Sequence, residues 1–467
     1  MDSDMQKFLG EAVAVVPSPR QLAWFDREYY AFVHYGMNTY TNREWGEGDE
    51  DPTLFNPSDL DCDEWVQTIK EAGMRGMILT AKHHDGFCLW PSAYTEHSVK
   101  NSPWRGGKGD VVREAAEACA RGGIPFGIYL SPWDRNSPLY GTPEYNDYYC
   151  NQLTELLTGY GELFEVWFDG ACGEGPNGKK QEYDFARYIA LIRKYQPNAV
   201  IFNDRGPDVR WIGNEAGVTR AAEWAVVPHE LCRNAEVQTG AGPEADGSLK
   251  GLYNTAEKIG GREQIVHSEG LCFVPSEADM SLRPGWFYHA EEEPHSIGRL
   301  MNTYFGTVGG NTTLLLNLSP MPSGRLDPYD RARLHRFGEI LRDAFETPMA
   351  GQTCVRTDGG DAVCTLELTL PEADRVRYVV LQEDLTQGQR VEKFDIYNPD
   401  DADEPGRSLY DGHTIGHKAI CPVNVDAKRL IVKVTAARAC PVFRSATLFG
   451  FNELGYVPMD LERDIVW

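Results

Sequence analysis

The 467-residue sequence has too few basic residues to bind nucleic acid or an anionic membrane. It contains 45 Lys and Arg against 70 Asp and Glu, so its formal net charge is -25. A protein that neutralises phosphate groups needs a cluster of positive charge, and the sequence contains no basic stripe. We therefore expect neither nucleic acid nor a membrane surface as a partner.

Long apolar runs and targeting signals are missing too. No stretch approaches the roughly 20 apolar residues that a membrane-spanning helix requires. The start of the chain, MDSDMQKFLGEAVAVVPSPR, lacks the basic region and apolar core of a signal peptide. The 11 cysteines are scattered without a CxxC pair, which is typical of reduced thiols in a reducing compartment. As it stands, the sequence predicts a cytoplasmic protein, unless a leader was trimmed from it.

Several motifs of nucleotide, zinc and serine chemistry are absent. The sequence contains no GxxxxGK[ST], no GxGxxG after a strand, no HxH or HExxH, and no serine nucleophile elbow. His83 and His84 are adjacent, and in an extended strand end their side chains would point to opposite sides. We therefore do not expect them to bind one metal ion, and we predict no cofactor.

The sequence does contain an alternation of short apolar strands and helical segments, from about residue 28 to 345. Strands such as YYAFVHYG and MRGMILTAKHHDG alternate with helices such as DEWVQTIKEAG and DVVREAAEACARGG. Apolar strands with helices between them are typical of a parallel sheet covered on its outside. We predict an α/β fold, a TIM-type (β/α)8-like barrel over residues 1–348, with an irregular stretch between about 205 and 290.

The pattern changes after residue 346. Short β-rich runs such as VCTLELTL, RVRYVVLQE and RLIVKVTAA follow one another, and turn residues rather than helices separate them. This pattern is typical of an all-β domain. We predict a C-terminal β-sandwich domain over residues 349–467.

Polar, ionisable or aromatic residues end five successive predicted barrel strands. They are His34 to Gly36, Lys82 to Gly86, Ser131 to Asp134, Trp167 to Gly170, and Asn203 to Gly206. The carboxyl ends of barrel strands meet on the face that carries the active site, so these residues should surround one site. This explains why the strand EVWF ends on a charge, because Asp169 then lies in a polar cavity instead of a dry core.

The residue types at these strand ends favour carbohydrate chemistry. Tryptophan rings stack on sugar faces, His and Arg bind hydroxyl groups, and two carboxyl groups, one ionised and one protonated, can cleave a glycosidic bond. The 11 Trp and 22 Tyr fit this reading, although a tryptophan-rich core explains them as well. The set indicates a glycosidase.

The chain resembles the α-L-fucosidases of glycoside hydrolase family 29 in seven stretches. They are FVHYGMNTYTNREWG, LTAKHHDGFCLWPS, FGIYLSPWDRN, VWFDGACG, NDRGPDVRWIGNEAG, SLRPGWFYH and NTTLLLNLSP. The resemblance covers about residues 20 to 345, and the β-rich part after it is similar to that family's C-terminal domain. It implies a retaining exo-α-L-fucosidase that works through a covalent fucosyl-enzyme, without a cofactor.

The resemblance also implies a role for individual residues. Asp169 in WFDG corresponds to the nucleophile, and Glu215 in WIGNEAG corresponds to the acid/base residue of the branch that cleaves α-1,3/1,4-linked fucose. The residues that would bind fucose are His34, Glu44, His83, His84, Trp167, Arg205 and Trp286. The two tryptophans would form an apolar wall at the C6 methyl group and the ring, and the others would bind hydroxyl groups.

Several alternatives stay open at this point. The acid/base residue could instead be Glu223, Glu269 or Glu277, and Trp45, Trp133 and Tyr129 fit a core role as well as a site role. The implied partner is a fucosylated, branched glycan of the Lewis type. A fucosidase of relaxed linkage preference, an inactive fucose-binding protein and a metal-dependent hydrolase are the competing interpretations.

Overall fold

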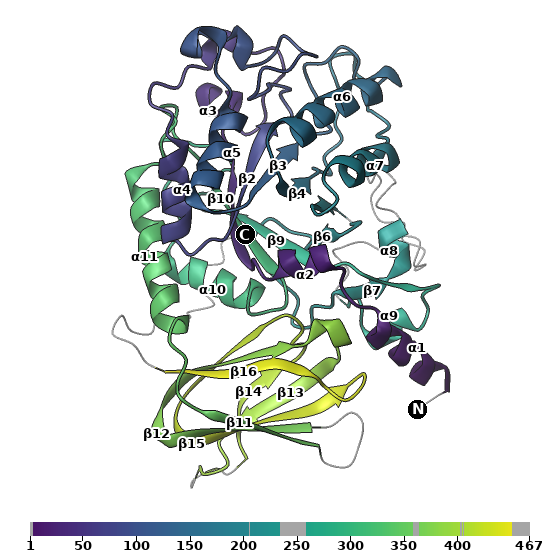
Figure 1. Cartoon of the computed structure of the whole chain (residues 1–467), viewed down its shortest axis with the longest axis vertical. Helices are drawn as coiled ribbons and strands as arrows, with labels where there is room; N and C mark the ends of the chain where they lie inside the picture. Colours follow the sequence, from purple (N-terminus) through teal and green to yellow (C-terminus); the bar gives the residue numbers. More distant parts are fainter. Residues whose placement is uncertain are drawn as a thin grey trace.

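The computed structural model describes residues 3–204, 206–233, 258–357, 364–401, 404 and 406–450. A closed barrel forms its upper part and an antiparallel β domain lies below (Figure 1). Both parts of the predicted fold class are therefore confirmed.

Eight parallel strands close the barrel in the order β1-β10-β9-β6-β5-β4-β3-β2. They are β1 (Tyr29–Val33), β2 (Met77–Lys82), β3 (Phe126–Leu130), β4 (Leu163–Trp167), β5 (Val200–Asn203), β6 (Val209–Trp211), β9 (Ser276–Ser281) and β10 (Thr313–Leu318). These strands are buried on both faces, apart from the last residue of β6, because side chains fill the barrel inside and helices cover it outside. The apolar runs of the sequence have this origin.

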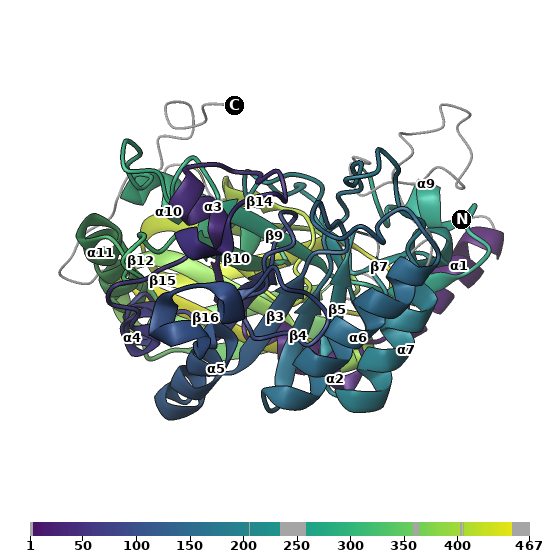
Figure 2. The ribbon, with the colours of Figure 1, turned by 90° about the horizontal axis from the view of Figure 1, so that it is seen from above.

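Amphipathic helices cover the outside of the barrel. They are α4 (Cys62–Glu71), α5 (Val111–Gly122), α6 (Glu144–Gly159), α7 (Phe185–Tyr195), α10 (Ile297–Thr307) and α11 (Pro328–Phe345). A short α3 (Met37–Thr41) follows β1, and Figure 2 shows α5, α6 and α7 beside β3 and β4. Four of the helices begin where an aspartate side chain caps a free N–H group, as Asp61, Asp110, Asp184 and Asp327 do.

The barrel is irregular after β5, as the sequence predicts. No helix separates β5 from β6 within the described part of this connection. Between β6 and β9 the chain inserts β7 (Val226–Pro228), α8 (His229–Arg233), α9 (Arg262–Ile265) and β8 (Leu271–Phe273). The strands β7 and β8 pair with each other outside the barrel.

The helix α2 (Pro19–Phe25) covers the amino end of the barrel, after a first helix, α1 (Ser3–Ala14). The side-chain amide of Gln21 donates to the carbonyl group of Asp208, just before β6, at 2.8 Å. It also donates to the carbonyl group of Phe273, shortly before β9, at 2.7 Å. The indole N–H of Trp24 donates to Glu165 inside the barrel, at 2.9 Å. These bonds connect α2 to three strands that are far from it in the sequence.

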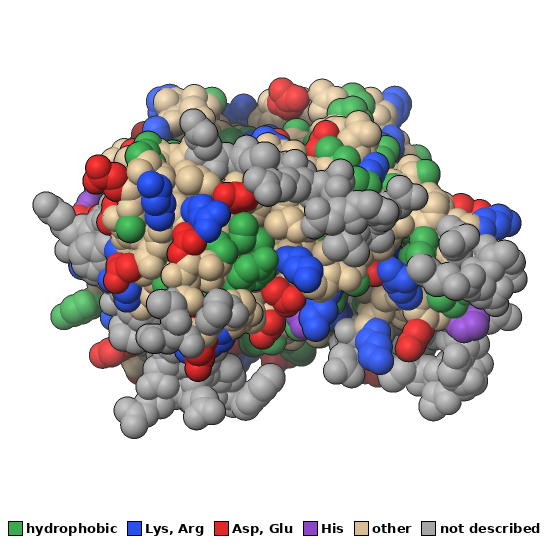
Figure 3. Space-filling model, turned by 90° about the horizontal axis from the view of Figure 1, so that it is seen from below, with side chains coloured by type: hydrophobic (Ala, Val, Ile, Leu, Met, Phe, Trp, Pro, Cys, Tyr) green, Lys and Arg blue, Asp and Glu red, His purple; other side chains and the backbone are tan. Residues whose placement is uncertain are grey.

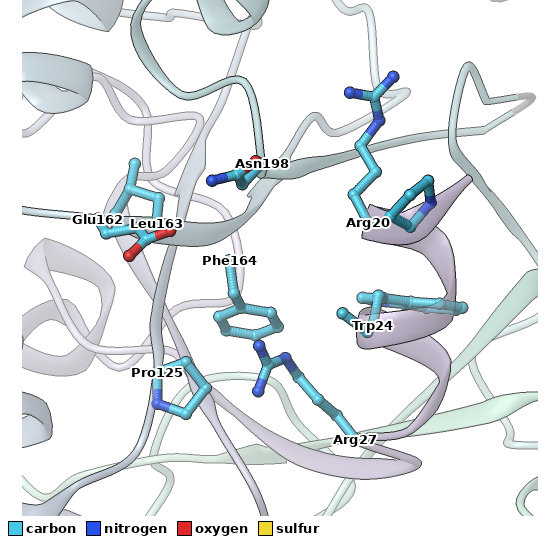
Figure 4. A pocket seen from close by; sticks show the side chains of 10 residues that line it. Arg20, Trp24, Arg27, Pro125, Glu162, Leu163, Phe164 and Asn198 are labelled. Carbon is cyan, nitrogen blue, oxygen red and sulfur yellow. The ribbon is translucent and has the colours of Figure 1, made fainter.

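A cavity of about 390 Å³ lies between α2 and the start of β4 (Figure 4). Arg20, Trp24, Arg27 and Phe164 are among its lining residues, and the Arg27 guanidinium lies 5.0 Å from the centre of the Phe164 ring. The cavity opens at the amino end of the barrel. It is therefore separate from the strand ends at which the sequence predicts the active site.

The strands of the C-terminal domain are all antiparallel within its described part, and one short 3-10 helix (Leu385–Gln387) accompanies them. The strands are β11 (Gln352–Thr357), β12 (Cys364–Glu383), β13 (Val391–Tyr397), β14 (Ser408–Gly412), β15 (Ala419–Ala437) and β16 (Phe443–Gly450). All six belong to one hydrogen-bonded sheet, because β12 and β15 are long and continue past a bulge after Thr369. The helix α11 ends at Phe345 and β11 begins at Gln352, and the predicted boundary at 348/349 stays a prediction.

The two domains meet beside α2 and the start of β1. The carboxylate of Glu28 accepts hydrogen bonds from His417, at 3.2 Å, and from Lys418 of the β domain. The His417 ring also stacks on Phe25, with the ring centres 4.7 Å apart. Figure 3, which views the molecule from below, shows acidic and basic side chains interspersed on the described surface.

The expectation that all cysteines are reduced is wrong at one position. Eight of the described cysteines are free, but Cys272 on β8 is disulfide-bonded. Cys272 belongs to no CxxC pair, so the sequence carried no signal of this bond. The cytoplasmic location stays a prediction.

Within the described part of the chain, no helix has the length and apolar character that crossing a membrane would require.

Candidate active site

Asp169 lies two residues beyond the end of β4, on the face where the barrel strands terminate. Its Oδ1 atom accepts the backbone N–H of Ala171 at 2.7 Å, and its Oδ2 atom accepts the hydroxyl of Tyr129 at 2.9 Å. Burial and the neighbouring carboxylate raise the pKa of Tyr129, so its hydroxyl keeps its proton. The Asp169 side chain is 23% exposed, and it is therefore both fixed in orientation and open to a ligand.

Three histidines form a wall beside Asp169. The Nε2 atom of His84 lies 3.7 Å from Asp169 Oδ2, and the His83 ring centre lies 4.1 Å from that of His84 and 5.7 Å from that of His34. The expectation that His83 and His84 point to opposite sides is therefore wrong. The strand β2 ends at Lys82 and the chain turns at His84, so the alternation of an extended strand no longer applies.

All three histidines are neutral because they are buried. Burial lowers the pKa of His34 to about 3 and that of His83 well below its ordinary value. Burial also lowers the pKa of His84, although the charge of Asp169 opposes that shift. Among the described residues, no group of three His, Cys, Asp or Glu side chains could hold a metal ion. The wall thus presents uncharged hydrogen-bonding groups.

Glu215 lies on the loop after β6, next to Trp286. The indole N–H of Trp286 donates to Glu215 Oε2 at 3.2 Å, and the Asn214 side chain accepts the backbone N–H groups of Ala216 and Val218, both at 3.1 Å. Burial raises the pKa of Glu215, and the charges of Asp169 and Glu44 raise it further. Glu215 nonetheless contacts solvent, and it lies close enough to Asp169 for the charge of Asp169 to act on it.

Glu44 orients the loop that carries Trp286. Its carboxylate accepts the backbone N–H groups of Trp286 and Phe287, at 2.8 and 3.1 Å, and contacts Nε2 of His289 at 2.7 Å. The Trp286 ring in turn lies 5.1 Å from the His34 ring. The predicted binding residues Glu44, Trp286 and His34 are therefore brought together. Much of the hydrogen-bonding capacity of the Glu44 carboxylate is used by groups of the protein itself.

Comparison with known proteins identifies the family of the chain. The profile of the family described as alpha-L-fucosidase matches residues 13–345, most of the chain. The chain belongs to the α-L-fucosidases of glycoside hydrolase family 29. It is 38% identical over 464 residues to Alpha-L-fucosidase 1 of Arabidopsis thaliana, covering 93% of this chain and 87% of that protein.

Solved structures of this family share the fold. A glycoside hydrolase 29 family member from an unknown rumen bacterium has a TM-score of 0.81 at 40% identity, covering 97% of this chain and 79% of that one. The GH29 fucosidase of Ruminococcus gnavus, in complex with fucose, has a TM-score of 0.79 at 28% identity, covering 94% and 96%. The protein is an α-L-fucosidase, and the prediction of a glycoside hydrolase is confirmed.

Two of the other three candidate acids of this fucosidase, Glu223 and Glu277, are buried within the protein. Glu223 is buried between Arg210 and Arg220, which lower its pKa and keep it charged. Glu269 donates its backbone N–H to Glu230, at 2.7 Å, beside the inserted strands. Glu277 is fully buried in the barrel and holds Tyr30 and Trp167. Of the four glutamates considered, Glu215 combines a raised pKa with access to the site.

Trp167 lies below Asp169 in the barrel. Its ring stacks on Phe202 with centres 4.1 Å apart, and its indole N–H donates to Glu277 at 2.7 Å. The ring centre is also 5.5 Å from that of Tyr129, which holds Asp169. Arg205, the remaining predicted sugar-binding residue of the fucosidase, lies outside the described residues.

The aromatic residues left open in the sequence take different places. Tyr129 contacts Asp169 directly, and Trp133 is buried with its ring centre 4.8 Å from that of His84. Trp45 is 57% exposed and meets Trp133 edge to face at 5.5 Å. An exposed tryptophan is not core packing, so Trp45 forms an open aromatic surface beside the histidine wall.

The sequence analysis placed Ser131 at a strand end without giving it a partner, and it missed Asn317 and Asn38, which also hydrogen-bond the histidines. Asn317 bonds His34, Ser131 bonds His84, and Asn38 bonds His83. Asn317 lies near the carboxyl end of β10, so the rule that found Asp169 and Ser131 could have found it too. No comparable signal marks Asn38, which lies in the helix after β1.

Proposed function

We propose that this α-L-fucosidase is a retaining exo-enzyme that removes terminal α-1,3/1,4-linked fucose from branched glycans of the Lewis type. Asp169 is the nucleophile and Glu215 the acid/base residue. One observation carries this assignment, namely that Glu215 has a raised pKa next to Trp286 while Asp169 accepts two fixed hydrogen bonds on the same face.

In the first step, the Asp169 carboxylate attacks the anomeric carbon of fucose. The bond to the leaving oxygen breaks, and Glu215 gives that oxygen its proton, so the products are a fucosyl ester of Asp169 and the shortened glycan. The raised pKa of Glu215 suits this step, because the group must be protonated beforehand.

In the second step, Glu215 acts as a base. Its carboxylate takes a proton from water, the water oxygen attacks the anomeric carbon, and the Asp169 ester bond breaks. Fucose leaves with its original anomeric configuration after two inversions. Both residues then return to their starting protonation states.

The linkage preference rests on the stretches REWG and RPGWFYH and on the position of Glu215, which resemble the narrower branch of the family. The exposed ring of Trp45 offers a surface for the sugar that carries the fucose. A fucosidase of relaxed linkage preference is the competing proposal.

The test compares three substrates, which are a glycan with α-1,3/1,4-linked fucose, an α-1,2-fucosylated glycan and an aryl α-L-fucoside. We expect much faster fucose release from the branched glycan than from the α-1,2-linked one, with α-fucose as the first product seen by proton NMR. Equal rates on both glycans would overturn the linkage proposal. Initial release of β-fucose would overturn the retaining mechanism.

A further inference from the structure

Each of the three histidines beside Asp169 has one ring nitrogen against a polar side chain of the protein. The pairs are His34 with Asn317, His84 with Ser131, and His83 with Asn38. We propose that these partners are positioning residues that fix which ring nitrogen of each histidine carries the proton. This proposal adds to the proposed function how the site directs hydrogen bonds to its substrate. It rests on the proposed function only for the identity of the sugar.

The His34 proton is set by Asn317 on β10. The Nδ1 atom of His34 lies 2.7 Å from Asn317 Oδ1. The Asn317 amide cannot be reversed, because its Nδ2 group donates to the carbonyl of Trp286, at 2.8 Å, and to Ser281 Oγ, at 3.0 Å. An oxygen therefore faces Nδ1, which must carry the proton. The Nε2 atom of His34 is left as an acceptor.

The His84 proton is set by Ser131 beyond the end of β3. The Ser131 hydroxyl lies 2.7 Å from the carbonyl of Trp133 and 2.8 Å from His84 Nδ1. A carbonyl can only accept, so the single hydroxyl hydrogen goes to Trp133. The second short contact then needs a hydrogen from Nδ1 of His84. Its Nε2 atom, 3.7 Å from Asp169 Oδ2, is an acceptor as well.

On His83 the proton lies on the other ring nitrogen, Nε2. The Asn38 Nδ2 group lies 3.0 Å from the carbonyl of Glu44, which can only accept, so the amide nitrogen faces this side. The same Nδ2 group lies 3.3 Å from Nδ1 of His83. It donates there, so Nδ1 carries no proton. The Nε2 atom of His83 therefore carries the proton and is a donor.

Burial keeps the three rings neutral, so each has one proton to place. The Nε2 atoms of His34 and His84 then accept hydrogen bonds, while that of His83 donates one. A sugar hydroxyl can do either, but this wall dictates the direction of each bond. The hydroxyl groups at His34 and His84 must donate, and the group at His83 must accept.

The first test reads the ring protons directly. Long-range nitrogen–proton NMR of protein labelled with ¹⁵N-histidine distinguishes the two neutral tautomers, and a His→Gln variant of each position assigns its signal among the 11 histidines. We expect Nδ1–H for His34 and His84 and Nε2–H for His83. A mixture of tautomers, or the opposite pattern, at any of the three would overturn the proposal.

The second test moves the proton of the His83 ring from one nitrogen to the other. Asn38→Asp replaces the donor that faces His83 with an acceptor of the same shape, so the His83 signal should change to the Nδ1–H form. The matched control is Asn136→Asp, which loses one bond to the carbonyl of Gly48, at 2.7 Å, and hydrogen-bonds no described histidine. An unchanged His83 in a folded Asn38→Asp protein would overturn the role of Asn38.

The third test uses the ligand. Monofluorinated L-fucoses can accept weakly but cannot donate, so fluorine opposite His34 or His84 should weaken inhibition about 10-fold or more, and less opposite His83. In Asn38→Asp, fluorine at the sugar position opposite His83 should weaken inhibition as strongly as it does opposite His34 or His84. Equal tolerance at every ring position would overturn the proposal. If the tautomers are as assigned but no fucoside is cleaved, the proposed function is overturned and the tautomer proposal stands.

Discussion

Two carboxyl groups, one within β4 and one just beyond it, show how the two ends of the barrel differ. Glu165 lies within β4 and points to the amino end, where Trp24 binds it and burial, with Glu277 nearby, raises its pKa well above the ordinary value. Asp169 lies just beyond the same strand, accepts two hydrogen bonds and reaches solvent. A closed environment keeps a carboxyl group protonated and structural, whereas an open, donor-rich one makes it usable for chemistry.

The same contrast applies to whole regions. At the carboxyl end, loops bring histidines, Glu215 and Trp286 around Asp169. At the amino end, α2 covers the barrel, and Glu28 connects it to the β domain through His417. We expect changes at the first end to affect turnover and changes at the second to affect stability.

The sharpest comparison is the same isosteric change at each end. Asp169→Asn removes the nucleophile, so kcat should fall on the order of 10⁴-fold or more, while fucose binding by calorimetry changes little. Glu165→Gln keeps an acceptor for Trp24 and should leave kcat within a few-fold. Substantial turnover by Asp169→Asn would exclude Asp169 as the nucleophile. A comparable loss in Glu165→Gln would break the contrast between the two ends.

Loss of the proton donor should have the next largest effect. Glu215→Gln should slow release from glycans by about 10²–10⁴-fold but affect an activated aryl fucoside much less, because a good leaving group needs no proton. Azide should accelerate Glu215→Ala and yield β-fucosyl azide. Equal losses on both substrates without rescue would point to another acid.

The pH profile of kcat/KM should carry the same signature. The rate on glycans should fall as the pH rises through the raised pKa of Glu215, because the group then loses the proton that it must donate. In Glu215→Gln this decline should vanish from the residual rate. A decline that persists would belong to a different group.

The contact between the domains should control acid stability. Burial opposes the charge of Glu28, but His417 and Lys418 overcome it and lower the pKa of Glu28 from 4.5 to about 2. The stabilisation is therefore complete above about pH 5 and is lost as the pH falls toward 2, on the order of 3 kcal/mol. Thermal unfolding should show that Glu28→Gln destabilises at neutral pH and much less at about pH 2.5. A constant difference would contradict the shift.

The smallest expected effect is a loss of stability when α2, which covers the amino end of the barrel, is altered. Trp24→Phe leaves a buried oxygen of Glu165 without its donor, which should cost about 1–3 kcal/mol of unfolding free energy while kcat/KM stays unchanged. Trp104→Phe is the control, since Trp104 is also buried but its indole nitrogen bonds no described residue. Equal losses in the two variants would show that only packing matters at Trp24.

Local sequence patterns were sufficient for much of this molecule. The apolar strands, the helices between them and the β-rich end follow from periodicity, and the polar strand ends located Asp169 and the three histidines. Family resemblance added Glu44, Glu215 and Trp286, which lie on loops without periodicity. The pattern did not foresee α2 as a cover, the bonded Cys272 or the side-by-side rings of His83 and His84.

The sequence by itself determined which residue types end the barrel strands, because burial on both faces favours apolar residues along a strand, whereas its carboxyl end opens toward the site. Tertiary structure decided what each of them bonds. Pairing of β1 with β10 closes the barrel and brings His34 against Asn317, 283 residues away, and loop packing brings Glu44 to Trp286, 242 residues away. Such contacts depend on closure of the whole sheet, and no local pattern encodes their geometry.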